Sequence, residues 1–349
     1  MNLLGLNKIR ALLERDRLDG LVVTKPTNVS YLSDFTGEGQ LLISSTRQFL
    51  ITDFRFQQEA WQEIKSFQLL PRESFVPLEE TLANAVKKLK IKRLGFEANN
   101  LSFSFYQKLL KACPQITLVP TQELIERVRA IKTAREIQLL RKAASCAVAS
   151  FAFAKNIIKE GKTEQEIAEG ILYFMKKSGA ETCAFDTIVA SGKRTALPHA
   201  RISTKTIKKN EAIIVDLGCL KDGYNSDLTR VVFLGKMSGK IKRIYDVVLR
   251  AQELAIQAVR AGEPIQKIDK IARHYITKAG FGPYFGHALG HGIGREVHEY
   301  PVISPRNQEA IQEGMVFTIE PGIYLPGLGG IRIEDMVLAT KTGAEILTH

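Results

Sequence analysis

The feature that most constrains this chain lies near its C-terminus, where two apolar, β-prone segments flank a loop rich in proline and glycine. The segments are 315–319 and 331–338; Glu320 directly follows the first, and Glu334 lies in the second. We expect two antiparallel strands with the loop centred near residue 327, which brings the two glutamates close together. Carboxylates on apolar strands are costly unless positive charge lies between them, and a metal ion is the usual source of that charge.

An earlier stretch repeats this arrangement. Residues 212–234 contain a second pair of apolar, β-prone segments, with turn residues at 221–223. Asp216 and Asp227 flank that turn at similar distances. We therefore expect a second antiparallel hairpin that also presents two carboxylates. A single acidic residue near a strand end is usually solvated or caps the chain, so the prediction of a site depends on this repetition.

A glycine-rich run lies between the two hairpins in the sequence. It covers residues 287–294 and carries His291 between two glycines. Together with the four acidic residues, this imidazole completes the donor set of a two-metal hydrolytic site. Ligands rich in oxygen suit Mn²⁺ or Co²⁺, and Zn²⁺ accepts them as well. We therefore predict two divalent metal ions per subunit.

Six short motifs follow one another through the C-terminal part of the chain. They are residues 215–218, 224–230, 290–294, 297–299, 318–322 and 331–335. These motifs resemble those of the pita-bread metallopeptidases, and within that family they are most similar to aminopeptidase P and prolidase (Xaa-Pro dipeptidase). The resemblance implies a mixed α/β (α+β) fold, in which a creatinase-like N-terminal domain (1–128) precedes a pita-bread catalytic domain (129–349) with two pseudo-twofold halves.

The resemblance also implies a role for each candidate residue. Five side chains take the places of metal ligands: Asp216, Asp227, His291, Glu320 and Glu334. Of these, Asp227 and Glu334 would bridge the two metals, and Glu320 would carry a proton from the attacking water to the leaving nitrogen. His298 would stabilise the tetrahedral oxyanion, and His199 would line the substrate pocket.

Further residues are candidates for supporting the site. Arg332 lies two positions before Glu334, hence on the same face of a strand, and can hold a ligating carboxylate from behind. Tyr224 can serve similarly, although it suits a core position nearly as well. Arg295 can meet a substrate carboxylate or can lie at the surface. His287 fits no ligand position, and we expect it to be structural.

The chain length of 349 residues favours two domains, which residues 123–129 are expected to connect. Before this connection, helical and β-prone segments alternate, which is typical of an α/β layer. They include a predicted hairpin of 40–44 and 48–52.

The second domain is expected to begin with helices. Thr133 and Thr163 are each followed by a glutamate three residues later, and this capping-box pattern marks a helix start. Residues 161–179 resemble 262–280, and an acid-bearing hairpin follows each segment. This internal repeat suggests two similar halves that place their hairpins around a shared site.

Composition limits the partners and the compartment. The net charge of +12 is spread along the chain without a basic block, so a solvated surface is favoured over nucleic-acid binding. The four cysteines show no Cys-x-x-Cys pairing, which is typical of free thiols in a reducing compartment. We find neither a signal peptide nor an apolar stretch of membrane length, so we expect a cytoplasmic protein that binds no membrane. The family resemblance implies a homodimer.

Three functional interpretations remain open from the sequence. The first is an Xaa-Pro aminopeptidase acting on proline-containing peptides, and the alternative is an Xaa-Pro dipeptidase restricted to dipeptides. They differ in whether the pocket is closed at the proline carboxylate, by Arg295 or by a neighbouring subunit. The third is a metal-free binding protein that kept the fold. Methionine aminopeptidase is disfavoured because its smaller relatives lack an N-terminal domain like residues 1–128. Creatinase is disfavoured because it lacks this full set of metal ligands.

Overall fold

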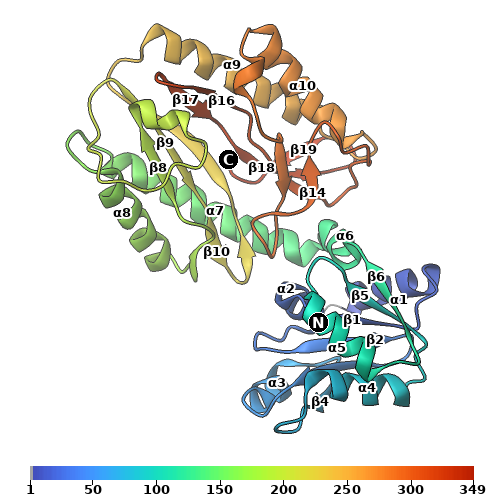
Figure 1. The fold of residues 1–349 in the computed structure, drawn as a ribbon. Helices are drawn as coiled ribbons and strands as arrows, with labels where there is room; N and C mark the ends of the chain where they lie inside the picture. Colours follow the sequence, from blue (N-terminus) through green and yellow to red (C-terminus); the bar gives the residue numbers. More distant parts are fainter. Residues whose placement is uncertain (1–2) are drawn as a thin grey trace. The chain divides into compact units, whose positions relative to one another are not determined.

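The computed structural model describes residues 3–349, and its elements fall into two units divided between Arg129 and Ala130 (Figure 1). The boundary suggested by the sequence lies one residue earlier. The predicted mixed fold of two α/β parts is confirmed.

The N-terminal unit is built on a six-stranded sheet in the order β4-β3-β2-β1-β5-β6. Its central strand β1 pairs antiparallel with β2 and parallel with β5. The elements are α1 (Leu3–Arg15), β1 (Gly20–Val23), α2 (Pro26–Ser33), β2 (Gln40–Ser44), β3 (Gln48–Thr52), α3 (Gln57–Glu63), β4 (Gln68–Pro71), α4 (Leu78–Lys88), β5 (Arg93–Glu97), α5 (Phe103–Ala112), β6 (Thr117–Thr121) and α6 (Leu124–Ala130). The predicted hairpin corresponds to β2 and β3.

Both faces of this sheet are covered, as its continuous apolar strands require. Leu21 and Val23 of β1 belong to one apolar cluster with residues of α1 and α2. Val22 points to the other face and belongs to a second cluster with residues of α4 and α5. The alternation follows from the two-residue period of a strand, and it produces a layer of helices on each side.

Two pairs of helices frame the second unit. They are α7 (Ala134–Ile157) with α8 (Glu164–Lys177), and α9 (Gly239–Ala258) with α10 (Ile265–Lys278). Figure 1 shows α9 and α10 along one side of the strands, and α7 and α8 along the other. Both predicted capping boxes are present, one at Thr133 and one at Thr163. Each helix pair precedes one of the acid-bearing hairpins, as the internal repeat suggested.

Helix α7 has the length and apolar composition of a membrane-spanning helix. Its apolar face packs against the core of the domain, however. Ala147 and Ala154 belong to a buried cluster that also contains residues of α8 and of the first hairpin. A core helix of a globular domain passes the same test of length and composition, so α7 is weak support for a membrane span.

The strands of the second unit form several small sheets between the helix pairs. In the first half, β12-β9-β8 and β11-β10-β7 are three-stranded; in the second, β14-β13-β15-β18-β19 is five-stranded and β16-β17 is a pair. Their bounds are β7 (Thr182–Cys183), β8 (Ile188–Ser191), β9 (Glu211–Leu217), β10 (Cys219–Lys221), β11 (Tyr224–Asn225), β12 (Leu228–Leu234), β13 (Gly290–Gly292), β14 (Glu299–Ile303), β15 (Val316–Ile319), β16 (Gly322–Leu325), β17 (Gly329–Arg332), β18 (Asp335–Ala339) and β19 (Ala344–Ile346). Short 3₁₀ turns span Gly192–Ala196 and Gly282–Tyr284.

Candidate metal centre

Glu320 and Glu334 lie at an interruption of the C-terminal hairpin. The β15–β18 ladder ends at Ile319 opposite Asp335, and the β16–β17 ladder begins at Gly322 opposite Arg332. Both ladders share one register, in which position 320 faces position 334. The interruption leaves both carboxylates outside the regular pairing.

The segment predicted as a long loop between these glutamates is mostly regular structure, so that part of the prediction is wrong. Residues 322–332 form the β16–β17 hairpin, which turns at 326–328. Ile323 and Ile331 pair across it and are fully buried. Four glycines were expected to be turn residues, but Gly322, Gly329 and Gly330 lie in the strands. A Cβ on Gly330 would come within 2.4 Å of the Thr195 carbonyl oxygen.

The first hairpin is interrupted in the same way. The β9–β12 ladder ends at Leu217 opposite Leu228, and the β10–β11 ladder begins at Leu220 opposite Asn225. In the common register, Asp227 faces Gly218. A Cβ on Gly218 would come within 2.1 Å of the Ser226 carbonyl oxygen, so only glycine fits this close approach of the two strands.

The two interruptions bring the acidic side chains together around His291 on β13. His291 Nε2 lies 3.7 Å from Asp227 Oδ2 and 3.3 Å from Glu320 Oε1. Ligand atoms of Asp227, His291 and Glu334 all lie within 4.8 Å of one another. The backbone N–H of Glu334 donates to the Thr229 carbonyl at 3.1 Å, which ties the second interruption to strand β12 of the first hairpin.

The electrostatics of this cluster favour a bound cation. Burial, together with repulsion from neighbouring carboxylates, raises the pKa of Asp227 and Glu334 well above the ordinary value. Burial also raises the pKa of Asp216, although Arg332 opposes this. Within residues 3–349, Asp216 Oδ1 and Glu334 Oε1 are buried oxygens without a hydrogen-bond partner. Buried carboxylate oxygens that lack donors are the expected state of metal ligands, so these residues fit divalent metal ions.

Two threonines that the sequence analysis missed orient the glutamates. Thr229 Oγ1 donates to Glu334 Oε2 at 2.6 Å, and Thr318 Oγ1 donates to Glu320 Oε1 at 3.2 Å. Thr318 Oγ1 also accepts the His291 backbone N–H at 3.1 Å. Thr318 is two positions before Glu320, and Thr229 is two positions after Asp227. The two-residue period of a strand therefore puts each threonine on the same side as an acidic residue of the cluster.

Arg332 contacts a carboxylate of the cluster and a tyrosine behind it. Its Nη2 donates to Asp216 Oδ2, and its Nη1 donates to the Tyr324 hydroxyl at 3.0 Å. The hydroxyl in turn lies 3.2 Å from His287 Nε2. Tyr324 and His287 therefore extend the network that fixes Asp216, and neither was assigned a site role from the sequence.

His298 and His199 lie at the exposed side of the cluster. The His291 and His298 rings are 4.2 Å apart between centroids, in an edge-on arrangement. Burial lowers the pKa of His298, as do the charges of His291 and His199, while Glu320 opposes them. The Pro198 carbonyl accepts from Arg332 Nη1 at 2.9 Å, which places the His199 segment beside the cluster. All candidate ligands and both further histidines thus belong to one region.

Tyr224 and Arg295 form a separate contact. The Tyr224 hydroxyl donates to Glu136 Oε1 at 3.1 Å, and its ring belongs to a buried cluster with residues of α7 and β15. The Arg295 guanidinium carbon lies 5.0 Å from the centroid of that ring. The structure therefore gives Tyr224 a core position, the alternative weighed from the sequence. A substrate contact of Arg295 stays a prediction.

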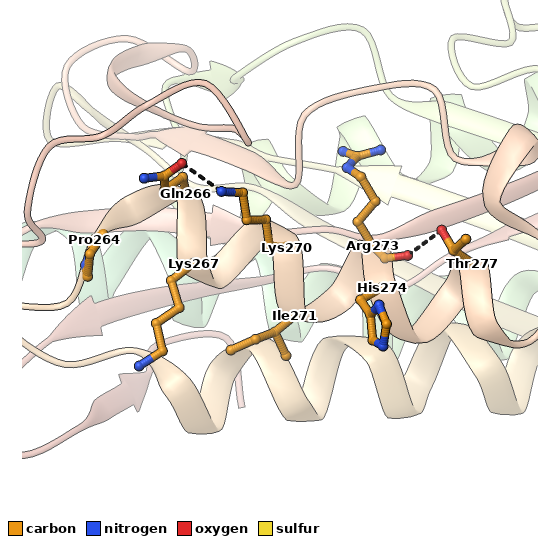
Figure 2. A pocket seen from close by; sticks show the side chains of 8 residues that line it. All are labelled: Pro264, Gln266, Lys267, Lys270, Ile271, Arg273, His274 and Thr277. Carbon is orange, nitrogen blue, oxygen red and sulfur yellow. Dashed lines mark hydrogen bonds between the residues drawn. The ribbon is translucent and has the colours of Figure 1, made fainter.

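A hollow on the outer face of α10 is distinct from this centre. Figure 2 shows its lining side chains, which come from α10 and the residue before it: Pro264, Gln266, Lys267, Lys270, Ile271, Arg273, His274 and Thr277. Lys267 and Arg273 are already paired with Glu263 and Asp269, at 2.7 Å each. The hollow shares no residue with the acidic cluster.

Each of the two units matches the model of a known protein family. Residues 138–341 match the model of metallopeptidase family M24, and residues 6–131 match that of the creatinase/prolidase N-terminal domain. The chain is 39% identical over 344 residues to an Xaa-Pro dipeptidase of Pyrococcus horikoshii, with 98% of this chain and 95% of that protein covered.

Two solved structures are also similar over nearly the whole chain. One is an Xaa-Pro dipeptidase from Bacillus anthracis, with a TM-score of 0.95 and 38% identity over 99% of this chain and 97% of that one. The other is an X-Pro aminopeptidase from Thermotoga maritima, with a TM-score of 0.88 and 38% identity over 95% of this chain and 96% of that one.

Proposed function

We propose that this chain, which belongs to metallopeptidase family M24, is a metal-dependent Xaa-Pro dipeptidase (prolidase) that hydrolyses the bond before proline. The observation that carries the proposal is the convergence of Asp227, His291 and Glu334 within 4.8 Å, next to buried carboxylate oxygens that lack partners. Such a centre suits hydrolysis of an amide bond at neutral pH.

We assign the metal ligands as Asp216, Asp227, His291, Glu320 and Glu334. A mainly oxygen donor set favours two Mn²⁺ or Co²⁺ ions, with Zn²⁺ as a further candidate. When bound, such ions supply a water of lowered pKa and polarise the carbonyl that is attacked. The number and identity of the metals are part of the proposal.

The other side chains of the centre bind, orient and move protons. Glu320 is the carboxylate proposed to take a proton from water and deliver it to the proline nitrogen. Arg332 fixes Asp216, and Thr229 fixes Glu334, so that neither carboxylate turns away from the cluster. His298 donates to the developing oxyanion, and His199 lines the pocket beside it.

The dipeptidase now takes precedence over the aminopeptidase that the sequence analysis placed first. The P. horikoshii and B. anthracis proteins are both Xaa-Pro dipeptidases, and each is matched over nearly its full length. The T. maritima aminopeptidase has the same 38% identity as the B. anthracis enzyme, so fold and motifs leave the two activities unresolved. Aminopeptidase activity therefore becomes the second candidate.

One experiment separates these activities. Protein freed of metal by a chelator and reloaded with Mn²⁺ is assayed on Xaa-Pro dipeptides and on matched Xaa-Pro-Yaa tripeptides. Cleavage of dipeptides alone supports the proposal, whereas comparable cleavage of tripeptides makes the chain an aminopeptidase. Inactivity on both, in a protein that binds no metal, would instead favour a binding protein that kept the fold.

The remaining proposals concern assembly and location. We propose a homodimer in the cytoplasm that acts on proline-containing peptides and binds neither nucleic acid nor membrane. The support is the family membership and the dispersed basic charge. Sedimentation of the purified protein tests the dimer directly.

A further inference from the structure

A buried ion pair lies beside the centre and has no role in the mechanism above. Lys132 Nζ is 2.8 Å from Glu299 Oε1, and the two side chains are only 1% and 2% exposed. Removing two charges from water is costly, and an apolar pair of similar volume is often as stable. The pair therefore suggests a role in defining one local structure.

Glu299 is the first residue of β14 and closes the loop 294–299 that leads to this strand; its carboxylate lies inside that loop. Its Oε2 accepts the backbone N–H of Glu296 at 3.3 Å. At the start of the loop, a Cβ on Gly294 would come within 2.6 Å of Glu299 Oε1, so glycine leaves the space that the carboxylate occupies. The loop is thus folded around the side chain that Lys132 holds.

Lys132 is itself fixed to the strand that leads to Glu320. Its backbone N–H donates to the Gly314 carbonyl at 2.9 Å, and Ile131 forms a β-bridge with Met315. Both contacts lie immediately before β15. Lys132 is therefore a rigid anchor that links this strand to the loop 294–299.

The loop contacts the His291 ring through His298. His291 Nδ1 lies 3.2 Å from the carbonyl of Gly292, at the end of β13. Nδ1 next to a carbonyl carries the proton, which directs Nε2 to the carboxylates. From the loop, His298 places its ring edge-on to that of His291, with 4.2 Å between the ring centroids.

We propose that Lys132 and Glu299 are positioning residues: they hold the loop 294–299 in the shape in which the His298 ring packs edge-on against His291, and this contact keeps His291 Nε2 turned to the carboxylates. The expected effect of these residues on catalysis rests on the proposed function. The expected effect on Mn²⁺ binding rests only on the carboxylates and the imidazole of the centre.

The test replaces both charges at once, because a single replacement leaves a buried charge without its partner. The variant is Lys132→Met/Glu299→Met, and the control is Arg141→Met/Glu345→Met, which removes another ion pair of 2.8 Å that is 37% and 43% exposed. Mn²⁺ binding to the chelator-treated proteins is measured by calorimetry, and unfolding midpoints are measured without metal.

We expect the Lys132/Glu299 double variant to fold but to bind Mn²⁺ about 10–100-fold more weakly than wild type, as for loss of other groups that orient metal ligands. We also expect kcat to fall with little change in KM, whereas the control keeps wild-type values. A merely structural pair would lower the unfolding midpoint and leave Mn²⁺ affinity and kcat within twofold, which would overturn the proposal. If the double variant does not fold, Lys132→Met/Glu299→Gln carries the same comparison, because it also removes both charges and keeps an acceptor for the Glu296 N–H.

Failure of the proposed function is distinguishable from failure of this inference. A wild-type protein that binds Mn²⁺ but cleaves no Xaa-Pro substrate would refute the dipeptidase. The Mn²⁺ affinities of wild type and double variant would still decide the role of the pair.

Discussion

Thr229 provides a sensitive test of how the centre is held together. The residue is fully buried, and its hydroxyl donates to Glu334 Oε2 at 2.6 Å while accepting from Arg332 Nε at 3.2 Å. Thr229→Val keeps the shape of the side chain and deletes only the hydroxyl. The carboxylate and the guanidinium would each lose a partner while remaining buried.

The structure sets the expected size of the effect. A buried polar group left unsatisfied costs about 1–3 kcal/mol. Arg332 keeps its contacts with Asp216, Tyr324 and Pro198, so most of the loss falls on Glu334. We therefore expect the metal-free Thr229→Val protein to be destabilised by about 1–3 kcal/mol, which lowers the unfolding midpoint of the second unit by roughly 2–10 °C.

Thermal unfolding of the metal-free protein and Mn²⁺ titration measure the two consequences separately. Because Thr229 orients Glu334, Mn²⁺ affinity should also fall about 10–100-fold. Thr229→Ser is the matched control, since it restores the hydroxyl and loses only a methyl group. If Thr229→Val unfolds at the wild-type temperature and binds Mn²⁺ normally, the hydroxyl does not hold Glu334, and the reasoning is refuted.

Three further changes test other parts of the argument. Glu320→Gln should abolish peptide hydrolysis and leave the circular dichroism spectrum unchanged; substantial residual turnover would remove the proton-transfer role. His298→Ala should lower kcat by roughly 10²–10³-fold in the same assay if the ring stabilises the oxyanion, whereas unchanged kinetics would make it structural. At the start of α8, hydrogen bonds from Lys162 and Thr163 lower the pKa of Glu166 from 4.5 to about 2. A folded-state pKa below the unfolded one stabilises the fold above pH 4.5, and this contribution disappears as pH falls towards 2. The difference in urea midpoint between wild type and Glu166→Gln should therefore shrink between pH 5 and pH 3, and a constant difference would contradict the assignment.

The local patterns predicted the helices and hairpins well because each has a physical cause within a few residues. The capping boxes at Thr133 and Thr163 are satisfied by side chains three positions away. The symmetry of each hairpin also follows from local turn residues, so the facing positions of Glu320 and Glu334 could be inferred. The strand pair inside the predicted loop could not be inferred, because β17 packs there against Thr195 from another part of the domain: the Gly330 N–H donates to Thr195 Oγ1 at 2.7 Å.

The same distinction separates the site residues that the sequence could give from those that it could not. Thr229 and Thr318 each lie two positions from a proposed acidic ligand, so strand periodicity places both threonines on the side of the cluster. The contact of Thr229 with Glu334 depends in addition on the packing of the two hairpins. The link from His287 through Tyr324 to Arg332 joins separate segments, and the strongest contact of Arg332 is to Asp216 of the other hairpin. No sequence spacing encodes such a contact, because it depends on how the two interrupted hairpins pack. The Lys132–Glu299 contact likewise joins residues that lie far apart in the sequence. It could therefore be found only in the three-dimensional structure.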